Sequence, residues 1–537
     1  MLNAITSLFR LARAGIVLAQ HGVRFVPKGM KAPFVLHLAR ALTLPIRVLS
    51  WPFRIGQPRD SRVSRALSKL GPSYIKLGQF LATRGDLIGS ELAADLRHLQ
   101  DRQPPFSMRE ARRAIEDSLG GKLEDHFVHF GPPLAAASIA QVHKATILHD
   151  GEERDVAVKI LRPGIEEQFR KDLNSYYFAA RTVEMVHAPS RRLKPVAVVE
   201  NLDRTTELEM DLRLEAAAIS EMADNIQGDQ AAETATFRVP EVDWRRTSKR
   251  VLTLEWIDGT PISNVEKLRE DGHDLELLGL TVLRSFLRQA MRDGFFHADM
   301  HQGNLLVEPD GTLVAVDFGI VGRLGKIERR FLAEILHGLI TRDYMLAAQI
   351  HFDAGYVPPH HSVAVFAQAM RAIGEPIHGR TADEISMADL LGQLFAYTDV
   401  FDMQTRPELI LLQKSMVIVE GVARSLDPNL NIWTAAEPVA KEWMEANYGV
   451  AGRLRDAGQG AGTVGRVLAD VPRLMEQAER SALAFADMAQ NGVRLDDETI
   501  KRIARENSRQ GLTGRFALWV GALALVVAAW AIVTGRM

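Results

Sequence analysis

FFHADMHQGNLLVEPDGTLVAVDFG, residues 295–319, carries the most specific pattern in this chain. Asp299 stands five positions before Asn304, and Asp317, which opens an Asp-Phe-Gly triplet, follows Asn304 by thirteen positions. Between them, two apolar runs flank Pro309-Asp310-Gly311, which predicts a β-hairpin with a tight turn. The stretch therefore places Asp299 and Asn304 before the turn of a predicted hairpin and Asp317 after it.

This spacing is typical of phosphoryl transfer from a magnesium nucleotide. In such sites a carboxylate orients or deprotonates the acceptor, an asparagine five residues later binds a metal, and an Asp-Phe-Gly aspartate holds that metal against the phosphates. Magnesium prefers hard oxygen ligands, which Asn304 and Asp317 supply. A metal centre built on His297, Asp299 and His301 is the alternative, but it lacks a distant fourth ligand. We therefore assign the chemistry to Asp299 and expect His297 to brace the loop.

The same hypothesis requires a lysine on an upstream strand, and DVAVKIL, residues 155–161, provides Lys159. Its ammonium is expected to pair with nucleotide phosphates and with a glutamate from a following helix. The candidate helix is TTELEMDLRLEAAAISEMADN, residues 205–225, in which Glu215 is the best-placed partner. The plainer alternative for this helix is an acidic, solvated face. In VLTLEWIDG, residues 251–259, backbone groups near Glu255 and Ile257 are expected to meet adenine.

A loop before Lys159 departs from the ordinary kinase pattern. Where a glycine-rich loop should cover the phosphates, the sequence PLAAASIAQVHKA, residues 133–145, supplies Ala135, Ala136, Ala137 and Ser138. Alanine restricts φ where glycine does not, so this loop should be stiffer. Nucleotide selectivity or phosphoryl transfer is expected to change as a result.

Composition and the order of patterns indicate the fold class. The 537 residues are 47% hydrophobic and include no cysteine, which excludes disulfides, thiolate zinc sites and a cysteine nucleophile and favours a reducing compartment. Strand-like runs at 142–148, 155–161 and 250–257 precede helical patterns from about 275 to 500. This order predicts an α+β fold with a strand-rich lobe followed by a helical lobe.

Two other patterns are weaker. GAGTVG, residues 460–465, fits G-x-G-x-x-G but follows a polar, helix-like segment, so a loop is predicted there rather than a dinucleotide site. Nucleic-acid binding is not expected, because aromatic residues make up only 7% of the chain and the one long basic stretch is interleaved with apolar residues.

Both ends of the chain have features of membrane contact. The first 59 residues carry basic but no acidic side chains and have apolar residues at helical spacing, which predicts short amphipathic helices. These helices either bind anionic lipid or dock on the protein's own core. FALWVGALALVVAAWAIVT, residues 516–534, is uncharged and about 28 Å long as a helix, enough to span a bilayer; a buried helix of a soluble core is the alternative. Basic residues concentrated before it place the main body in the cytoplasm.

We expect six regions along the chain. They are a basic amphipathic membrane-facing segment (1–59), a helical extension (60–110), a strand-rich lobe with the Ala-rich loop and nucleotide lysine (111–260), a helical lobe with the catalytic and metal motifs (261–500), a basic linker (501–514) and a transmembrane anchor (515–536).

In this order the motifs resemble the UbiB family of atypical protein-kinase-like proteins, which are required for ubiquinone (coenzyme Q) biosynthesis. The family hallmark Lys-x-Gly-Gln is present as Lys76-Leu77-Gly78-Gln79, followed by LQDRQPP at 99–105. The Ala-rich loop and Lys159 come next, then Glu209-Met210-Asp211 with Glu215, then the residues of the opening stretch. By motif the resemblance covers residues 74–317, and the C-terminal anchor extends it.

The resemblance implies a protein-kinase-like two-lobe fold with an N-terminal helical extension and a C-terminal transmembrane helix. It places Lys76 and Gln79 over the catalytic site, beside the acidic pair Glu209 and Asp211, where a protein substrate would otherwise enter. ATP or ADP and Mg²⁺ are the implied cofactors, and ATP hydrolysis coupled to the handling of polyprenylphenol or quinone intermediates is the implied activity. A direct oxidation is not expected, since no flavin, haem or non-haem iron motif is present.

The expected partners are membrane lipids, other ubiquinone biosynthesis enzymes and a second copy in a homodimer. The expected location is the bacterial inner membrane, with a single-pass C-terminal anchor and a cytoplasmic body. Many bacterial members of the family end in two adjacent membrane helices, whereas this chain has room for one. Two alternatives stay open: phosphorylation of a protein or small molecule, and a nucleotide-binding scaffold without turnover.

Overall fold

A computed structural model describes residues 2–21, 62–82, 103–186, 194–227, 237–378, 400–403 and 407–448, with a few single residues between these ranges. Most of these residues belong to one compact unit, Met1–Met444, and the second unit, Glu445–Met537, is described only to residue 448. The predicted loop at 460–465, the linker at 501–514 and the predicted span at 516–534 lie outside the described residues.

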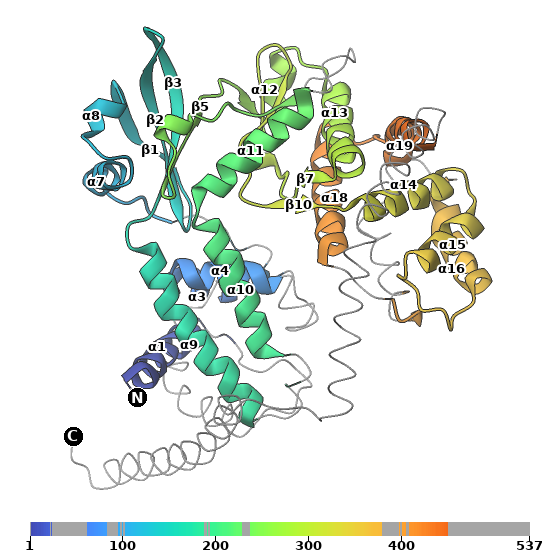
Figure 1. The fold of residues 1–537 in the computed structure, drawn as a ribbon, viewed down its shortest axis with the longest axis horizontal. Helices are drawn as coiled ribbons and strands as arrows, with labels where there is room; N and C mark the ends of the chain where they lie inside the picture. Colours follow the sequence, from blue (N-terminus) through green and yellow to red (C-terminus); the bar gives the residue numbers. More distant parts are fainter. Residues whose placement is uncertain are drawn as a thin grey trace, which may run out of the picture. The chain divides into compact units, whose positions relative to one another are not determined.

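The strand-rich lobe is built on one antiparallel sheet with strand order β1-β2-β3-β5 (Figure 1). Its strands are β1 (His129–Ala136), β2 (Ala140–His149), β3 (Glu152–Leu161) and β5 (Val251–Glu255), which confirms the three predicted strand runs. Side chains alternate across a strand, so Val156, Val158 and Ile160 share one face and Lys159 points to the other. The buried apolar face packs with α7 (Met108–Leu119) and α8 (Leu123–His126). Core packing thus fixes the direction of Lys159.

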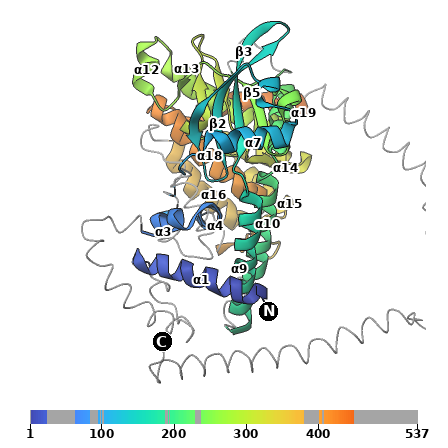
Figure 2. The ribbon, with the colours of Figure 1, turned by 90° about the vertical axis from the view of Figure 1, so that its left-hand side faces the viewer.

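Five helices before and after this sheet pack together. Helices α3 (Arg62–Leu70) and α4 (Pro72–Ala82) fall within the extension predicted at 60–110, and they pack with α1 (Leu2–Gln20), α9 (Ile165–Val186) and α10 (Pro195–Glu209). Figure 2 shows α1 lying across α9. Asp172 of α9, which is 5% exposed, accepts hydrogen bonds from Arg10 of α1 and Ser73 of α4. One buried carboxylate therefore joins three helices.

The prediction of a single helix at 205–225 is wrong, because this segment forms parts of two helices. Helix α10 ends at Glu209 and α11 (Leu212–Gln227) begins after Asp211. The Asp211 carboxylate accepts the backbone N–H of Arg213 at 3.2 Å, and it pairs with the guanidinium of the same residue at 2.6 Å. Aspartate at such a position competes with a continuous helix by bonding backbone groups locally. The break lets Glu209 and Glu215 come from two different helices.

The helical lobe begins with small elements around the predicted hairpin. These are β4 (Phe237–Arg238), β6 (Thr260–Pro261), α12 (Val265–Glu270), α13 (Leu275–Arg288), the π-helical turn η5 (Gln289–Asp293), β7 (Phe295–His297), η6 (Gln302–Asn304), β8 (Leu305–Val307), β9 (Leu313–Ala315) and β10 (Val321–Arg323). The short turn η4 (Trp244–Arg246) packs on β5 of the strand-rich lobe. Antiparallel pairing of β8 with β9 confirms the hairpin. Strand β4 pairs in parallel with β9, and β7 pairs with β10.

The remaining helices are α14 (Lys326–Ile340), α15 (Tyr344–Asp353), α16 (Val363–His378), α18 (Pro407–Leu426) and α19 (Ile432–Tyr448). Helix α18 packs along α13 and contributes Val419 and Ala423 to the main core, while α15 and α16 share a smaller core around Phe366 and Phe401. A strand-rich lobe followed by a helical lobe confirms the α+β class. Of the helices that the structure describes, none combines the length and apolar character needed to cross a bilayer.

Candidate active site

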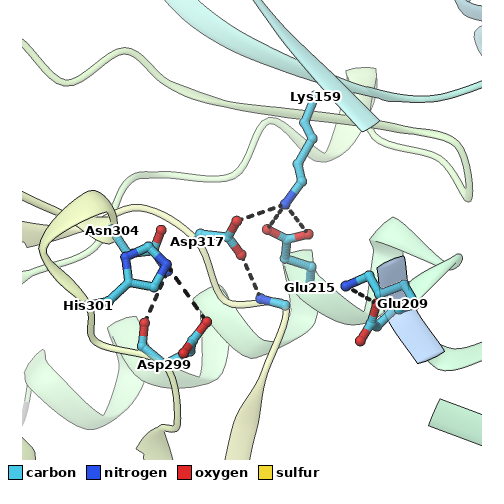
Figure 3. Close-up of polar contacts among 9 residues, drawn as sticks. Lys159, Glu209, Glu215, Asp299, His301, Asn304 and Asp317 are labelled. Atoms are coloured by element: carbon cyan, nitrogen blue, oxygen red, sulfur yellow. Dashed lines mark hydrogen bonds and ion pairs between the residues drawn. The ribbon is translucent and has the colours of Figure 1, made fainter. Parts of the chain in front are cut away.

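Lys159 lies at the centre of a partly buried charge cluster (Figure 3). Its ammonium donates to both carboxylate oxygens of Glu215, at 2.7 and 2.9 Å, and to Asp317 Oδ2 at 3.3 Å. These three residues come from β3, from α11 and from the loop after β9, 158 positions apart at the extremes. The fold thus joins the predicted lysine, its predicted glutamate and the predicted metal aspartate.

The two carboxylates of this cluster differ in environment. The Glu215 side chain is 7% exposed and that of Asp317 is 45% exposed. Burial raises the pKa of Glu215, and Lys159 opposes this rise. Burial also acts to raise the pKa of Asp317, but Lys159 and the N–H of Gly319 outweigh it and lower that pKa. Asp317 is therefore ionised and accessible, while Glu215 holds the lysine from the buried side.

The lysine itself remains charged. Burial acts to lower the pKa of Lys159, but the negative charges of Asp317 and Glu215 outweigh it and raise the pKa. A cation held in this way can bind the phosphates of a nucleotide as a point charge.

The predicted catalytic loop is held by hydrogen bonds to its own backbone. Buried His297 accepts the N–H of Asp299 through Nδ1 at 3.1 Å, and its ring packs on Phe318 with centroids 4.6 Å apart. The Asn304 amide nitrogen donates to the carbonyl of Asp299 at 3.1 Å. His301 lies beside Asp299, 3.8 Å from its carboxylate, and its Nδ1 accepts the N–H of Gly303. His297 thus braces the loop, as predicted.

Asn304 and Asp317 form a donor set that fits Mg²⁺. The Asn304 nitrogen is used within the loop, which leaves its amide oxygen for a ligand. Asp317 presents an ionised carboxylate with Oδ1 fixed by the Gly319 N–H at 3.0 Å. Carboxylate and amide oxygens are ligands that this hard cation prefers, and the imidazole groups nearby are not needed.

The Lys-x-Gly-Gln helix reaches the acidic pair through one residue. Lys76 on α4 contacts Glu209 on α10 at 2.7 Å, with both side chains largely buried. Asp211 pairs with Arg213 of its own segment. Gln79 lies half-buried on α4, and among the described residues it makes no hydrogen bond to Glu209 or Asp211. The resemblance placed Lys76 and Gln79 beside Glu209 and Asp211. Of these four residues, Lys76 and Glu209 are in direct contact.

Arg162 clamps the Ala-rich loop, a role that the sequence did not reveal. Its guanidinium donates to the carbonyl of Ala137 at 3.0 and 3.2 Å and to the carbonyl of Pro104 at 2.8 Å. The turn of Ala137 to Ala140 closes through a backbone bond of 2.8 Å. Ala135 and Ala136 lie at the end of β1, and Ser138 is fully buried. The sequence did not predict this contact, because Arg162 directly follows β3 in a position where an exposed arginine is common.

The expected adenine segment is anchored by a second unforeseen arginine. Arg238 on β4 pairs with both Glu255 oxygens, at 2.8 and 2.9 Å, and with Glu308 at 2.7 and 2.8 Å. The backbone N–H of Glu255 is occupied by the carbonyl of Glu241. The N–H of Ile257 donates to no acceptor among the described residues, so it is the backbone donor that a base could use.

A strand lysine paired with a helix glutamate, facing an Asp-Phe-Gly aspartate and a loop with aspartate and asparagine, defines a protein-kinase-like core. Residues 98–351 match the model of the ABC1 atypical kinase-like domain, and residues 370–431 match that of the UbiB helical domain. The chain belongs to the UbiB family.

Relatives cover most of this chain. A protein of Marinobacter nauticus named "Probable protein kinase UbiB" is 40% identical over 430 residues, 77% of either chain. One of the same name from Xylella fastidiosa is 36% identical over 482 residues, 87% of this chain and 84% of that one. A solved structure titled as a complex of Rv3197 with erythromycin, from Mycobacterium tuberculosis, is 25% identical and covers 75% of this chain and 97% of its own, with a TM-score of 0.47.

Proposed function

We propose that this protein is a membrane-anchored, Mg²⁺-dependent ATPase or atypical kinase that acts in ubiquinone biosynthesis and assists access to, or hydroxylation of, polyprenylphenol precursors. Its membership in the UbiB family supports the pathway. The Lys159, Glu215 and Asp317 cluster supports nucleotide binding.

The observation that carries the proposal is the Lys76–Glu209 ion pair beside that cluster. It brings the Lys-x-Gly-Gln helix against α10, next to the helix that carries Glu215. In this position the extension restricts a protein acceptor, and Asp299 then orients water or a small lipid-like hydroxyl. Lys159 would bind the nucleotide phosphates, and Asn304 and Asp317 would hold Mg²⁺, an ion that, when bound, would supply positive charge to the transferred phosphoryl group.

Helix α1 supports contact with a membrane surface. Ile5, Leu8 and Phe9 are 54%, 60% and 72% exposed on this helix, which also carries the exposed, basic Arg13. Apolar side chains beside basic ones suit the interface of an anionic bilayer. This surface supports the proposal that the protein acts beside lipid, together with the predicted C-terminal anchor.

The test is ATP hydrolysis by the full chain on vesicles of anionic lipid, with and without a polyprenylphenol-like compound. We expect Asp317→Asn to lower turnover at least 100-fold, because the metal loses its ionised ligand. Asp310→Asn, on the exposed hairpin turn, is the matched control and should leave turnover unchanged. Unchanged turnover in Asp317→Asn would refute the mechanism.

The fate of the γ-phosphate separates hydrolysis from phosphorylation. Release of labelled inorganic phosphate supports the ATPase, whereas label on a lipid or protein that depends on Asp299 identifies a kinase. Nucleotide binding without either outcome identifies the scaffold. In cells, loss of the gene should remove ubiquinone and accumulate an early prenylated phenol.

A further inference from the structure

Two adjacent histidines and an aspartate form a cluster in the helical lobe, distinct from the nucleotide site. His360 and His361 lie in the connection between α15 and α16, and Asp402 follows Phe401, which packs in the core of these helices. The chain separates His361 from Asp402 by 41 positions. Folding alone therefore brings the three side chains together.

The distances match the edges of a tetrahedral metal site. Asp402 Oδ2 lies 3.2 Å from His361 Nε2 and 3.5 Å from His360 Nε2. A zinc ion with bonds of about 2.05 Å to nitrogen and oxygen separates its ligand atoms by roughly 3.3 Å. One potential ligand atom from each residue lies within 4.8 Å of the other two. The three atoms can thus face one ion with small side-chain adjustments.

The histidine rings are also held close to one another. Their centroids are 4.2 Å apart, an arrangement that adjacent residues do not require. A divalent cation placed between the two rings and the Asp402 carboxylate can take one ligand atom from each of the three side chains.

The supporting backbone is anchored. Pro358 and Pro359 precede the histidines and restrict φ, and His361 donates its N–H to the carbonyl of Pro358 at 3.2 Å. Buried Phe401 contacts the His361 ring, with centroids 5.4 Å apart. The ligand set is therefore presented by two fixed segments, while the His360 and Asp402 side chains, 65% and 67% exposed, are open to an ion from solvent.

We propose that His360, His361 and Asp402 bind a divalent transition-metal ion of the zinc class, with water in the fourth position. Two imidazole nitrogens and one carboxylate favour Zn²⁺, Co²⁺ or Ni²⁺ over Mg²⁺. The ion links the connection after α15 to the segment at Phe401. This site is separate from the Mg²⁺ proposed at Asn304 and Asp317.

The experiment is equilibrium dialysis of untagged full-length protein against Zn²⁺, with excess Mg²⁺ to occupy oxygen-rich sites. We expect one Zn²⁺ bound by the wild type and none by His360→Ala/His361→Ala at the same free concentration. Asp402→Asn keeps the size of the side chain and removes its charge, and it should weaken binding at least tenfold. If the double variant binds zinc as the wild type does, or the wild type binds none, the proposal is wrong.

Two controls test the location of the ion. His149→Ala removes an exposed histidine that neighbours a single aspartate, and His301→Ala removes the histidine beside Asp299; both should retain the ion. Should the double variant fail to fold, His360→Ala alone serves, since its side chain is mostly exposed. Co²⁺ bound to the wild type should give the intense visible bands of a four-coordinate ion, and a pale six-coordinate spectrum would contradict the assigned geometry.

Discussion

Lys159 shows how a single position acquires its role at the residue scale. Strand alternation turns it away from the core formed by Val158 and Ile160, and Glu215 then holds it by two contacts. Because Glu215 is almost fully buried, its charge depends on this lysine.

Lys159→Met should destabilise the protein by about 3–5 kcal/mol, since it leaves a buried carboxylate without its cation. Glu215→Gln should cost less, about 1–3 kcal/mol, because the lysine keeps Asp317. Urea unfolding measures both, with Lys144→Met as the control. Lys144 pairs with Asp155 but is 41% exposed, so its loss should change stability by less than about 1 kcal/mol. Equal effects of Lys159→Met and Lys144→Met would contradict this account.

His297 should make stability depend on pH. Burial lowers its pKa to about 4, below the value of about 6.5 for an unfolded imidazole. The unfolded chain therefore binds the proton first, so this contribution is complete above about pH 6.5 and declines as the pH falls toward 4. Between pH 7 and 5 the loss is about 2 kcal/mol. We expect His297→Gln to remove this part of the pH dependence and exposed His149→Gln to keep it; identical slopes in wild type and His297→Gln would exclude the effect.

At the scale of elements, two features should stiffen the Ala-rich loop. Alanine limits the backbone of residues 135–137, and Arg162 fixes the turn to the segment at Pro104. The effect of the alanines can be predicted from the sequence, whereas the contacts of Arg162 join residues far apart in the chain.

Arg162→Met should increase hydrogen exchange of the amides at 136–140 several-fold and lower stability by about 1–2 kcal/mol, because the carbonyls of Ala137 and Pro104 lose their donors. Exchange monitored by mass spectrometry, together with nucleotide affinity, measures the change. Arg154→Met, on an exposed part of β3, is the matched control. Unaltered exchange in the Arg162 variant would show that alanine alone stiffens the loop.

At the scale of the whole molecule, Asp172 and Arg238 join parts that lie far apart in the chain. Asp172 ties α1 and the Lys-x-Gly-Gln helix to α9, and Arg238 ties β5 to the hairpin of the helical lobe. These contacts connect α1, the helix that we propose to lie on lipid, to the helix that carries Lys76.

Deleting residues 515–536 should move the protein from the membrane to the soluble fraction, with weak, salt-sensitive rebinding to anionic vesicles through the basic N-terminal segment. Cell fractionation and vesicle flotation measure both effects. Phe9→Ser adds the matched test, since it changes the most exposed apolar side chain of α1 and should weaken rebinding of the deleted form. Full retention of the deleted form at the membrane in high salt would show that the predicted helix is not the anchor.

The sequence by itself determined the fold class, the hairpin, and the order of Lys159, Asp299, Asn304 and Asp317, because strand alternation and catalytic spacing are local patterns. It also predicted Glu215 as the lysine's partner. Only the tertiary structure decided that α10 and α11 are separate helices and that Lys76 meets Glu209 while Asp211 turns to Arg213.

The clamps of Arg162 and Arg238 and the cluster of His360, His361 and Asp402 likewise required the folded chain. Such contacts join residues tens to hundreds of positions apart. A periodic sequence pattern cannot predict these contacts, because the packing of helices and strands determines which partner a long polar side chain reaches.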